Sequence, residues 1–155
     1  MIKQFSKITE SVGSIKFKLG LDIHGVIDSL PEVFSFLSKA VIDAGGEVHI
    51  LTGSKIEQAK EELKKYNITY THLFSIQDYH EKLGTPTKGT HPKYGFPMID
   101  DDAWDLTKGD YCRKHNISLH IDDTLVYNDN FTTPFARLWT HTGTPKVNKD
   151  TRHLD

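Results

Sequence analysis

The sequence predicts an α/β fold, a three-layer sandwich in a single domain with a central, mainly parallel, Rossmann-like sheet. Residues 15–23 alternate between apolar and polar side chains, which is typical of a strand. Further strand-like segments alternate with helix-like segments, and this alternation predicts a parallel sheet covered by helices on both faces. The length of 155 residues suits one domain with a substantial hydrophobic core.

The first half of the chain is expected to continue from the strand at 15–23, in which Gly20 permits close packing on one face. A helix follows, and Ser29 is expected to cap its N-terminus. Its apolar stripe is expected to include Val33. Residues 48–51 form a short apolar run, which predicts a buried second strand.

A second helix is expected to begin after Thr52 and Gly53. Ser54 and Glu57 have the spacing of a capping box, in which a hydroxyl and a carboxylate satisfy the first backbone N–H groups of a helix. Residues 69–76 combine β-branched and aromatic side chains and predict a third strand.

The second half of the chain is less regular. Residues 77–103 are rich in Gly, Pro, Thr and Lys toward their end and are expected to form a small cap or loop insertion. Thr107 is expected to cap a third helix at 108–115. Two further strands are expected at 117–121 and 136–139.

Composition excludes several classes of protein. Nineteen basic and 21 acidic residues give a net charge of −2, which is too balanced for a generally basic nucleic-acid binder. The single cysteine, Cys112, excludes an internal disulfide framework and an all-cysteine zinc site. No apolar run approaches the ~18 residues of a membrane span, so no membrane partner is expected. Without a secretory signal, the expected location is the cytoplasm.

Polar residues follow the predicted strands at the points where these strands end. Asp22 follows the first strand, Thr52 the second, and Asp122 and Asp123 the fourth, while Lys108 begins the preceding helix. The carboxyl ends of parallel strands meet at one edge of a sheet, where ligands bind. Three carboxylates at this edge repel one another and need a cation, and oxygen ligands favour Mg²⁺.

The same edge is expected to bind an anion. Thr52, Gly53 and Ser54 offer a hydroxyl and backbone N–H groups at a predicted helix N-terminus. Lys108 adds a positive charge beside the metal. A metal, an anion site and a carboxylate nucleophile together indicate phosphoryl transfer through an aspartyl-phosphate.

Residues 15–125 contain segments that resemble, in order, the four motifs of the haloacid-dehalogenase-like phosphatases. These segments are LGLDIHGVID, HILTGS and TKGDYCRKHNISLHIDDT, the last of which covers the third and fourth motifs. The family order of Asp, Thr, Lys and paired acids is kept. The resemblance implies a haloacid-dehalogenase-like fold, with 77–103 as an insertion between the second and third motifs.

The resemblance also implies a metal site. Asp22 would be a ligand as well as the nucleophile, and the backbone carbonyl of His24 would be a second ligand. Asp122, together with Asp123, would complete the Mg²⁺ shell, with one of the two acids able instead to orient the other.

On the substrate side, the resemblance implies that Thr52 holds the phosphoryl oxygens and that Lys108 neutralises Asp22 and the transferring group. His24 departs from the family pattern, because these phosphatases normally carry Asp there as the general acid and base. A histidine titrates close to neutral pH and can perform both tasks. His24 is therefore the candidate acid and base.

The expected function is a Mg²⁺-dependent phosphomonoester hydrolase acting on a phosphorylated small molecule, a nucleotide or a nucleic-acid end. The alternative is a Mg²⁺- and phosphate-binding module in which His24 impairs hydrolysis. A phosphoacceptor receiver domain also uses acids, Thr and Lys around Mg²⁺. Its paired acids follow the first strand, whereas here the pair Asp122 and Asp123 comes last, which argues against it.

Several other polar residues have simpler interpretations. Asp28 is expected to cap the helix that follows it, and the run Asp100–Asp102 to form a solvated turn. His49, His72 and His120 lie inside predicted strands and are expected to be structural. In the insertion, two interpretations stay open for a set of polar residues, namely contact with a phosphate or nucleotide and an ordinary solvated loop. These residues are Lys88, His91, Lys93 and Tyr94.

Overall fold

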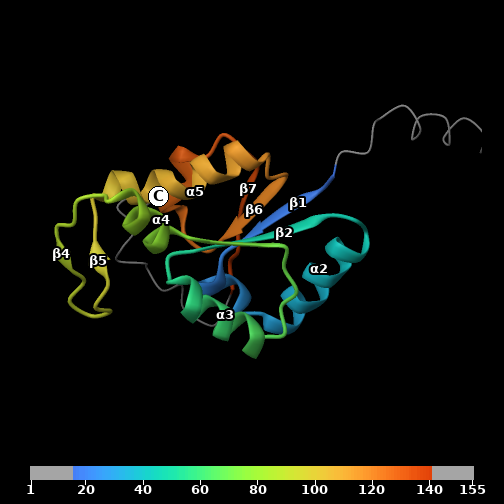
Figure 1. Ribbon diagram of the computed structural model, residues 1–155. Coiled ribbons are helices and arrows are strands. Elements are labelled where there is room, and N and C mark those ends of the chain that lie inside the picture. The colour runs from blue at the N-terminus through green and yellow to red at the C-terminus, as the bar shows by residue number, and fades with distance from the viewer. Residues whose placement is uncertain (1–15, 141–155) are drawn as a thin grey trace, which may run out of the picture.

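The computed structural model describes residues 16–140, which form a five-stranded parallel sheet (Figure 1). β1 (Lys18–Leu21) lies at its centre between β2 (Glu47–Thr52) and β6 (Leu119–Asp122). β3 (His72–Ser75) and β7 (Phe135–Arg137) form the edges. The predicted α/β class and parallel sheet are confirmed. The first position of the predicted strand 15–23 lies outside the described residues.

Helices cover both faces of the sheet (Figure 1). α2 (Pro31–Asp43) and α3 (Ile56–Lys65) pack on one face, over a core that includes Leu21 and Ile50. α5 (Asp101–His115) packs on the other face through Cys112, and α4 (Ile76–Leu83) lies beside it. No helix within residues 16–140 combines the length and the apolar character needed to cross a membrane.

Gly20 allows the tight packing expected of it on the α5 face of the sheet. A Cβ added at Gly20 would lie 2.7 Å from Nδ1 of His120 and 3.1 Å from Cδ1 of Leu51. Because Gly20 has no side chain, the buried ring of His120 fits between the β1–β6 pair and α5.

Two expectations around the start of α2 are wrong. Ser29 makes no cap, and Leu30 precedes the helix without a side-chain hydrogen bond. Asp28 does not cap the helix either, because its Oδ1 accepts a hydrogen bond of 2.7 Å from the backbone N–H of Gly25. Asp28 thus closes the turn that follows β1. Val33 is 54% exposed and lies outside the core.

The predicted capping box at the start of α3 is also wrong. The backbone N–H of Ile56 donates instead to Oδ2 of Asp78 at 2.7 Å. Asp78 is in the first turn of α4, a helix that the sequence pattern did not reveal and that Ser75 caps by accepting from the N–H of Asp78. A side chain of α4 therefore accepts the hydrogen bond from the first backbone N–H of α3.

The segment 77–103 contains most of α4, a two-stranded hairpin of β4 (Gly89–Thr90) and β5 (Pro97–Met98), and the first turn of α5. The hairpin projects beyond the end of the sheet (Figure 1). Asp100, predicted to be in a solvated turn, caps α5 by accepting from the N–H of Asp102.

Several boundaries in the second half differ from their predictions, and β6 covers 119–122 instead of 117–121. α5 begins well before the expected 108–115, so Thr107 lies inside the helix and donates to the carbonyl of Ala103 instead of capping. Lys108 consequently lies in the middle of the helix. β7 ends at Arg137, before the predicted limit of 139.

Asp78→Ala is expected to lower the free energy of unfolding by about 1 kcal/mol, because it leaves the N–H of Ile56 without its acceptor. Ser54→Ala, which a capping box would make equally costly, should change it by less than about 0.5 kcal/mol. Urea unfolding of both variants against the wild type measures the difference. Equal losses in the two variants would contradict the assignment of Asp78 as the cap.

Candidate functional site

The register of the sheet brings the predicted acids to one edge. Leu21 of β1 is level with Ile50 of β2 and with Ile121 of β6. Asp22 and Asp122 therefore leave neighbouring strands side by side, and the end of β2 at Thr52 lies on the other side of Asp22. This is the carboxyl edge of a parallel sheet, where α/β proteins bind their ligands.

Three carboxylates share this edge. One oxygen each from Asp22, Asp122 and Asp123 lie within 4.8 Å of one another, and the first two residues are buried. Carboxylates so close repel one another unless protons or a cation neutralise them. Oxygen donors at this spacing are of the type that a hard divalent cation such as Mg²⁺ binds. The donor set therefore fits the predicted metal.

Lys108 places a positive charge against two of these carboxylates. Its Nζ lies 3.2 Å from Oδ1 of Asp22 and 2.7 Å from Oδ2 of Asp122, and its side chain is 2% exposed. The ammonium also lies over the ring of Tyr127, 4.7 Å from its centroid. A buried lysine costs free energy unless it is paired, and two carboxylates pair it here.

The residue after Lys108 lets α5 come close enough to deliver it. A side chain on Gly109 would overlap the backbone carbonyl of Asn130, which belongs to the short helix η2 (Leu125–Asn130). Gly109 thus permits the close contact between α5 and the segment that follows β6. That segment also carries Tyr127, so the lysine and its aromatic neighbour are positioned together.

Burial and the neighbouring charges raise the pKa values of two of the three acids and lower that of the third. Burial raises the pKa of Asp22 to about 7, with Lys108 opposing and Asp122 adding to the rise. Burial and the charge of Asp122 raise the pKa of Asp123 to about 6. Burial acts likewise on Asp122, but Lys108 and His120 outweigh it and hold its pKa well below the ordinary range.

The two neighbouring carboxylates keep Lys108 charged in spite of its burial. Burial acts to lower its pKa, but the carboxylates of Asp122 and Asp22 outweigh burial and raise the pKa above the ordinary range. The site thus contains a permanent cation, a permanent anion on Asp122, and two acids that gain or lose protons near neutrality. A divalent cation would displace those protons.

Asp122 is fixed by two further donors. His120 Nε2 donates to Oδ2 of Asp122 at 3.1 Å, and the backbone N–H of Thr124 donates to its Oδ1 at 3.2 Å. The ring of His120 is fully buried and stacks on Phe131. His120, whose place inside a strand predicts a structural role, thus contacts the buried acid directly.

The turn after β1, η1 (Ile23–Ile27), places His24 beside the acids. Gly25 has a φ of +78°, which favours glycine, and a side chain there would overlap the carboxyl group of Asp123. The turn can therefore lie against Asp123 only with glycine at this position. Its closure by Asp28 fixes the backbone that carries His24.

The imidazole of His24 is half-exposed and contacts α3. Its Nε2 lies 2.9 Å from Oε2 of Glu62. Because a carboxylate only accepts, Nε2 carries the hydrogen, and Nδ1 is then the proton acceptor of the neutral ring. Nothing in the sequence indicates that Glu62 contacts His24, because acidic residues are common on the polar face of a helix.

The predicted anion-binding segment follows β2. Thr52 is fully buried, and its Oγ1 accepts a hydrogen bond of 3.2 Å from the N–H of Ser54, which does not use the hydroxyl hydrogen. Gly53 packs against Trp104, which a Cβ on Gly53 would approach to 3.0 Å. Thr52 and Ser54 therefore lie at the same sheet edge as Asp22.

A second group of side chains whose spacing could hold a metal ion lies near the opposite edge, formed by Glu47, His49 and His72. The rings of His49 and His72 are stacked at 4.0 Å. Both nitrogens of His49 already have partners, Tyr111 at 2.9 Å and Glu47 at 2.8 Å. These contacts agree with the structural role expected of His49.

Comparison of the chain with protein-family models, with curated proteins and with solved structures gave no match.

In the absence of divalent cations, the wild type is expected to lose stability relative to Asp22→Asn as the pH rises from about 4 to 8. A carboxyl whose pKa rises from 3.8 to about 7 on folding binds its proton more tightly in the folded state. The resulting stabilisation is complete below the lower value and is lost as the pH rises through the higher one. The loss is on the order of 3 kcal/mol.

Urea unfolding at a series of fixed pH values measures this difference. Asp43→Asn, which removes an exposed acid on α2, serves as the control and should follow the wild type at every pH. A stability difference between wild type and Asp22→Asn that does not change with pH would contradict the electrostatics described for this edge.

Proposed function

We propose that this protein is a Mg²⁺-dependent phosphomonoester hydrolase of the haloacid-dehalogenase type that acts through an aspartyl-phosphate on Asp22. The observation that carries the proposal is the buried Lys108, which contacts both Asp22 and Asp122 at the carboxyl edge of the sheet. The order of the residues along the chain supports the same family. Asp123 and the backbone carbonyl of His24 are proposed to complete the metal site together with Asp22 and Asp122.

The strand order supports this family over a receiver domain. Counted along the sheet, the strands follow the order third, second, first, fourth, fifth, with β1 at the centre. Receiver domains have the order second, first, third, fourth, fifth, which places the first strand elsewhere. The paired acids also follow the fourth strand of the sheet, β6, and the nucleophile the first.

In the first step of the proposed reaction, a carboxylate oxygen of Asp22 attacks phosphorus and the bond from phosphorus to the leaving oxygen breaks. A Mg²⁺ ion held by Asp22, Asp122 and Asp123 would supply positive charge that keeps Asp22 ionised and offsets charge on the phosphoryl oxygens. Lys108 lies against Asp22 and stabilises the same negative charge from the protein side. Thr52 donates its hydroxyl hydrogen to a phosphoryl oxygen.

His24 moves the protons in both steps. It gives a proton to the leaving oxygen in the first step, and in the second it takes one from the water that attacks the phosphorus of the aspartyl-phosphate. The Asp22–phosphate bond then breaks and releases inorganic phosphate. Glu62 orients the imidazole by accepting from Nε2, so that proton transfer runs through Nδ1.

Release of phosphate from an aryl phosphate in the presence of Mg²⁺ tests the proposal. Asp22→Asn should have no activity above background, because the amide cannot act as the nucleophile. His24→Ala should lower kcat by about 10²- to 10⁴-fold and remove its contribution to the pH profile. Glu62→Gln should reduce kcat less, because it leaves the imidazole in place and removes only the carboxylate that orients it.

His115→Ala is the matched control, since His115 is an exposed histidine at the far end of α5 and should be dispensable. Activity that survives Asp22→Asn would exclude Asp22 as the nucleophile. Stabilisation by Mg²⁺ with a phosphate mimic, but no turnover of any phosphoester, would exclude hydrolysis and favour the binding module. His24→Asp should then create activity.

A further inference from the structure

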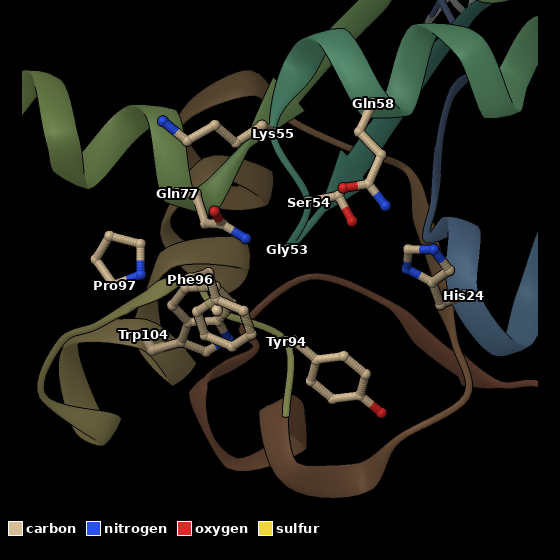
Figure 2. A pocket seen from close by; sticks show the side chains of 11 residues that line it. His24, Gly53, Ser54, Lys55, Gln58, Gln77, Tyr94, Phe96, Pro97 and Trp104 are labelled. Carbon is tan, nitrogen blue, oxygen red and sulfur yellow. The ribbon is translucent and has the colours of Figure 1, made fainter. Parts of the chain in front are cut away.

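A pocket of about 720 Å³ opens beside the candidate site, between the β2–α3 connection, α4, α5 and the β4–β5 hairpin (Figure 2). Its lining includes His24, Gly53 and Ser54, which flank the positions of Asp22 and Thr52 in the sequence. A substrate with its phosphate at Asp22 would therefore extend into this pocket. The volume lies within the range of about 300–1,000 Å³ typical of small-molecule sites.

One wall of the pocket is aromatic. The rings of Phe96 and Trp104 are stacked, with centroids 5.7 Å apart and planes inclined by 20°. The ring of Tyr94 is almost parallel to that of Phe96, with an angle of 7° between the planes. Trp104 is held by its Nε1–H, which donates to the hydroxyl of Tyr127 at 3.3 Å. His91 also stacks on Phe96, with 4.8 Å between the ring centroids, so the rings already pack against one another. Together they form a firm aromatic wall against which a flat aromatic group can pack.

The other wall is polar. Figure 2 shows the side chains of Ser54 and Gln58 on the side of the pocket away from the stacked rings, and that of Gln77 on the α4 side. Gln58 donates through Nε2 to Glu62, which leaves its amide oxygen as an acceptor. Amide side chains present a donor and an acceptor together, the pattern that pairs with the edge of a nucleobase.

The charge of the lining suits an anionic ligand. Its ionisable side chains are His24, Lys55 and Tyr94, and none of the described lining residues is an acid. Lys55 is at the mouth, where it pairs with Glu81. The negative charge of the three carboxylates at the neighbouring site therefore does not continue into the pocket.

We propose that this pocket binds the base of a nucleotide, which packs against the aromatic wall of Tyr94, Phe96 and Trp104 and meets the amides of Gln58 and Gln77. The inference rests on the proposed phosphatase function and narrows its substrate class to phosphate esters of nucleosides. A free nucleoside monophosphate and the phosphorylated end of a nucleic-acid chain share this chemistry. The coupling of Trp104 to Tyr127, which covers Lys108, links base binding to the reacting centre.

The test compares kcat/KM in Mg²⁺ for adenosine 5′-monophosphate, ribose 5-phosphate and phenyl phosphate. The wild type should prefer the nucleotide to both, by about 5- to 50-fold. Tyr94→Ala, which removes a ring that is 67% exposed, should lower the ratio of nucleotide to ribose phosphate by about tenfold, mainly through KM. Gln58→Ala should lower the ratio of nucleotide to phenyl phosphate.

The control is Phe36→Ala, because Phe36 is an aromatic side chain on α2 that is 77% exposed and does not line the pocket. It should leave the activity and both ratios unchanged. Hydrolysis of ribose phosphate or phenyl phosphate as efficient as that of the nucleotide would overturn the base pocket while leaving the phosphatase intact. Comparing a 5′-phosphorylated trinucleotide with the mononucleotide shows whether the pocket prefers a nucleic-acid end or a free nucleotide.

A binding measurement distinguishes the base pocket from the proposed phosphatase activity. Asp22→Asn, which cannot turn over substrate, is titrated with adenosine 5′-monophosphate or ribose 5-phosphate in Mg²⁺ while tryptophan fluorescence is followed. The nucleotide should quench Trp104 and bind at least tenfold more tightly than ribose phosphate. Equal affinities would overturn the base pocket, and tighter nucleotide binding without wild-type turnover would uphold the pocket and reject the phosphatase.

Discussion

The contact of a buried ammonium with two buried carboxylates determines the arrangement of the whole site. Lys108 reaches Asp22 and Asp122 from the middle of α5, across the ends of the two central strands. The contact requires α5 to pack tightly on the sheet, which Gly20 and Gly109 permit by lacking side chains. One positive charge does not balance three crowded acids. That imbalance underlies the raised pKa values of Asp22 and Asp123 and the proposed need for a divalent cation.

The same helix connects the charged edge to the hairpin. Trp104 precedes Lys108 by one turn of α5 and packs against Gly53, while Tyr127 contacts both Trp104 and Lys108. The phosphate end and the proposed base pocket therefore share one rigid wall. A substrate that binds through both ends is held more precisely than one that binds through its phosphate alone, and precise placement favours reaction.

Local patterns predicted the sheet and the acids at its edge, because Asp22, Thr52 and Asp122 each end an apolar run. They could not predict contacts that depend on the tertiary fold. The acceptor for Ile56 comes from Asp78, 22 residues along the chain, and the partner of His24 is Glu62, 38 residues away. Helix α4 was missed because it follows β3 directly, so a strand pattern passes into a helix without an intervening loop.

Whether the three acids form a cation site is measured by calorimetric titration of the protein with Mg²⁺ near pH 6.5, in buffers of different ionisation enthalpy. We expect one ion per chain and a release of protons on binding, because the pKa values of Asp22 and Asp123 are raised to about 7 and about 6. Asp122→Asn should abolish the binding. If the wild type binds no Mg²⁺, or binds it without releasing protons, the acids at this edge do not form the proposed cation site.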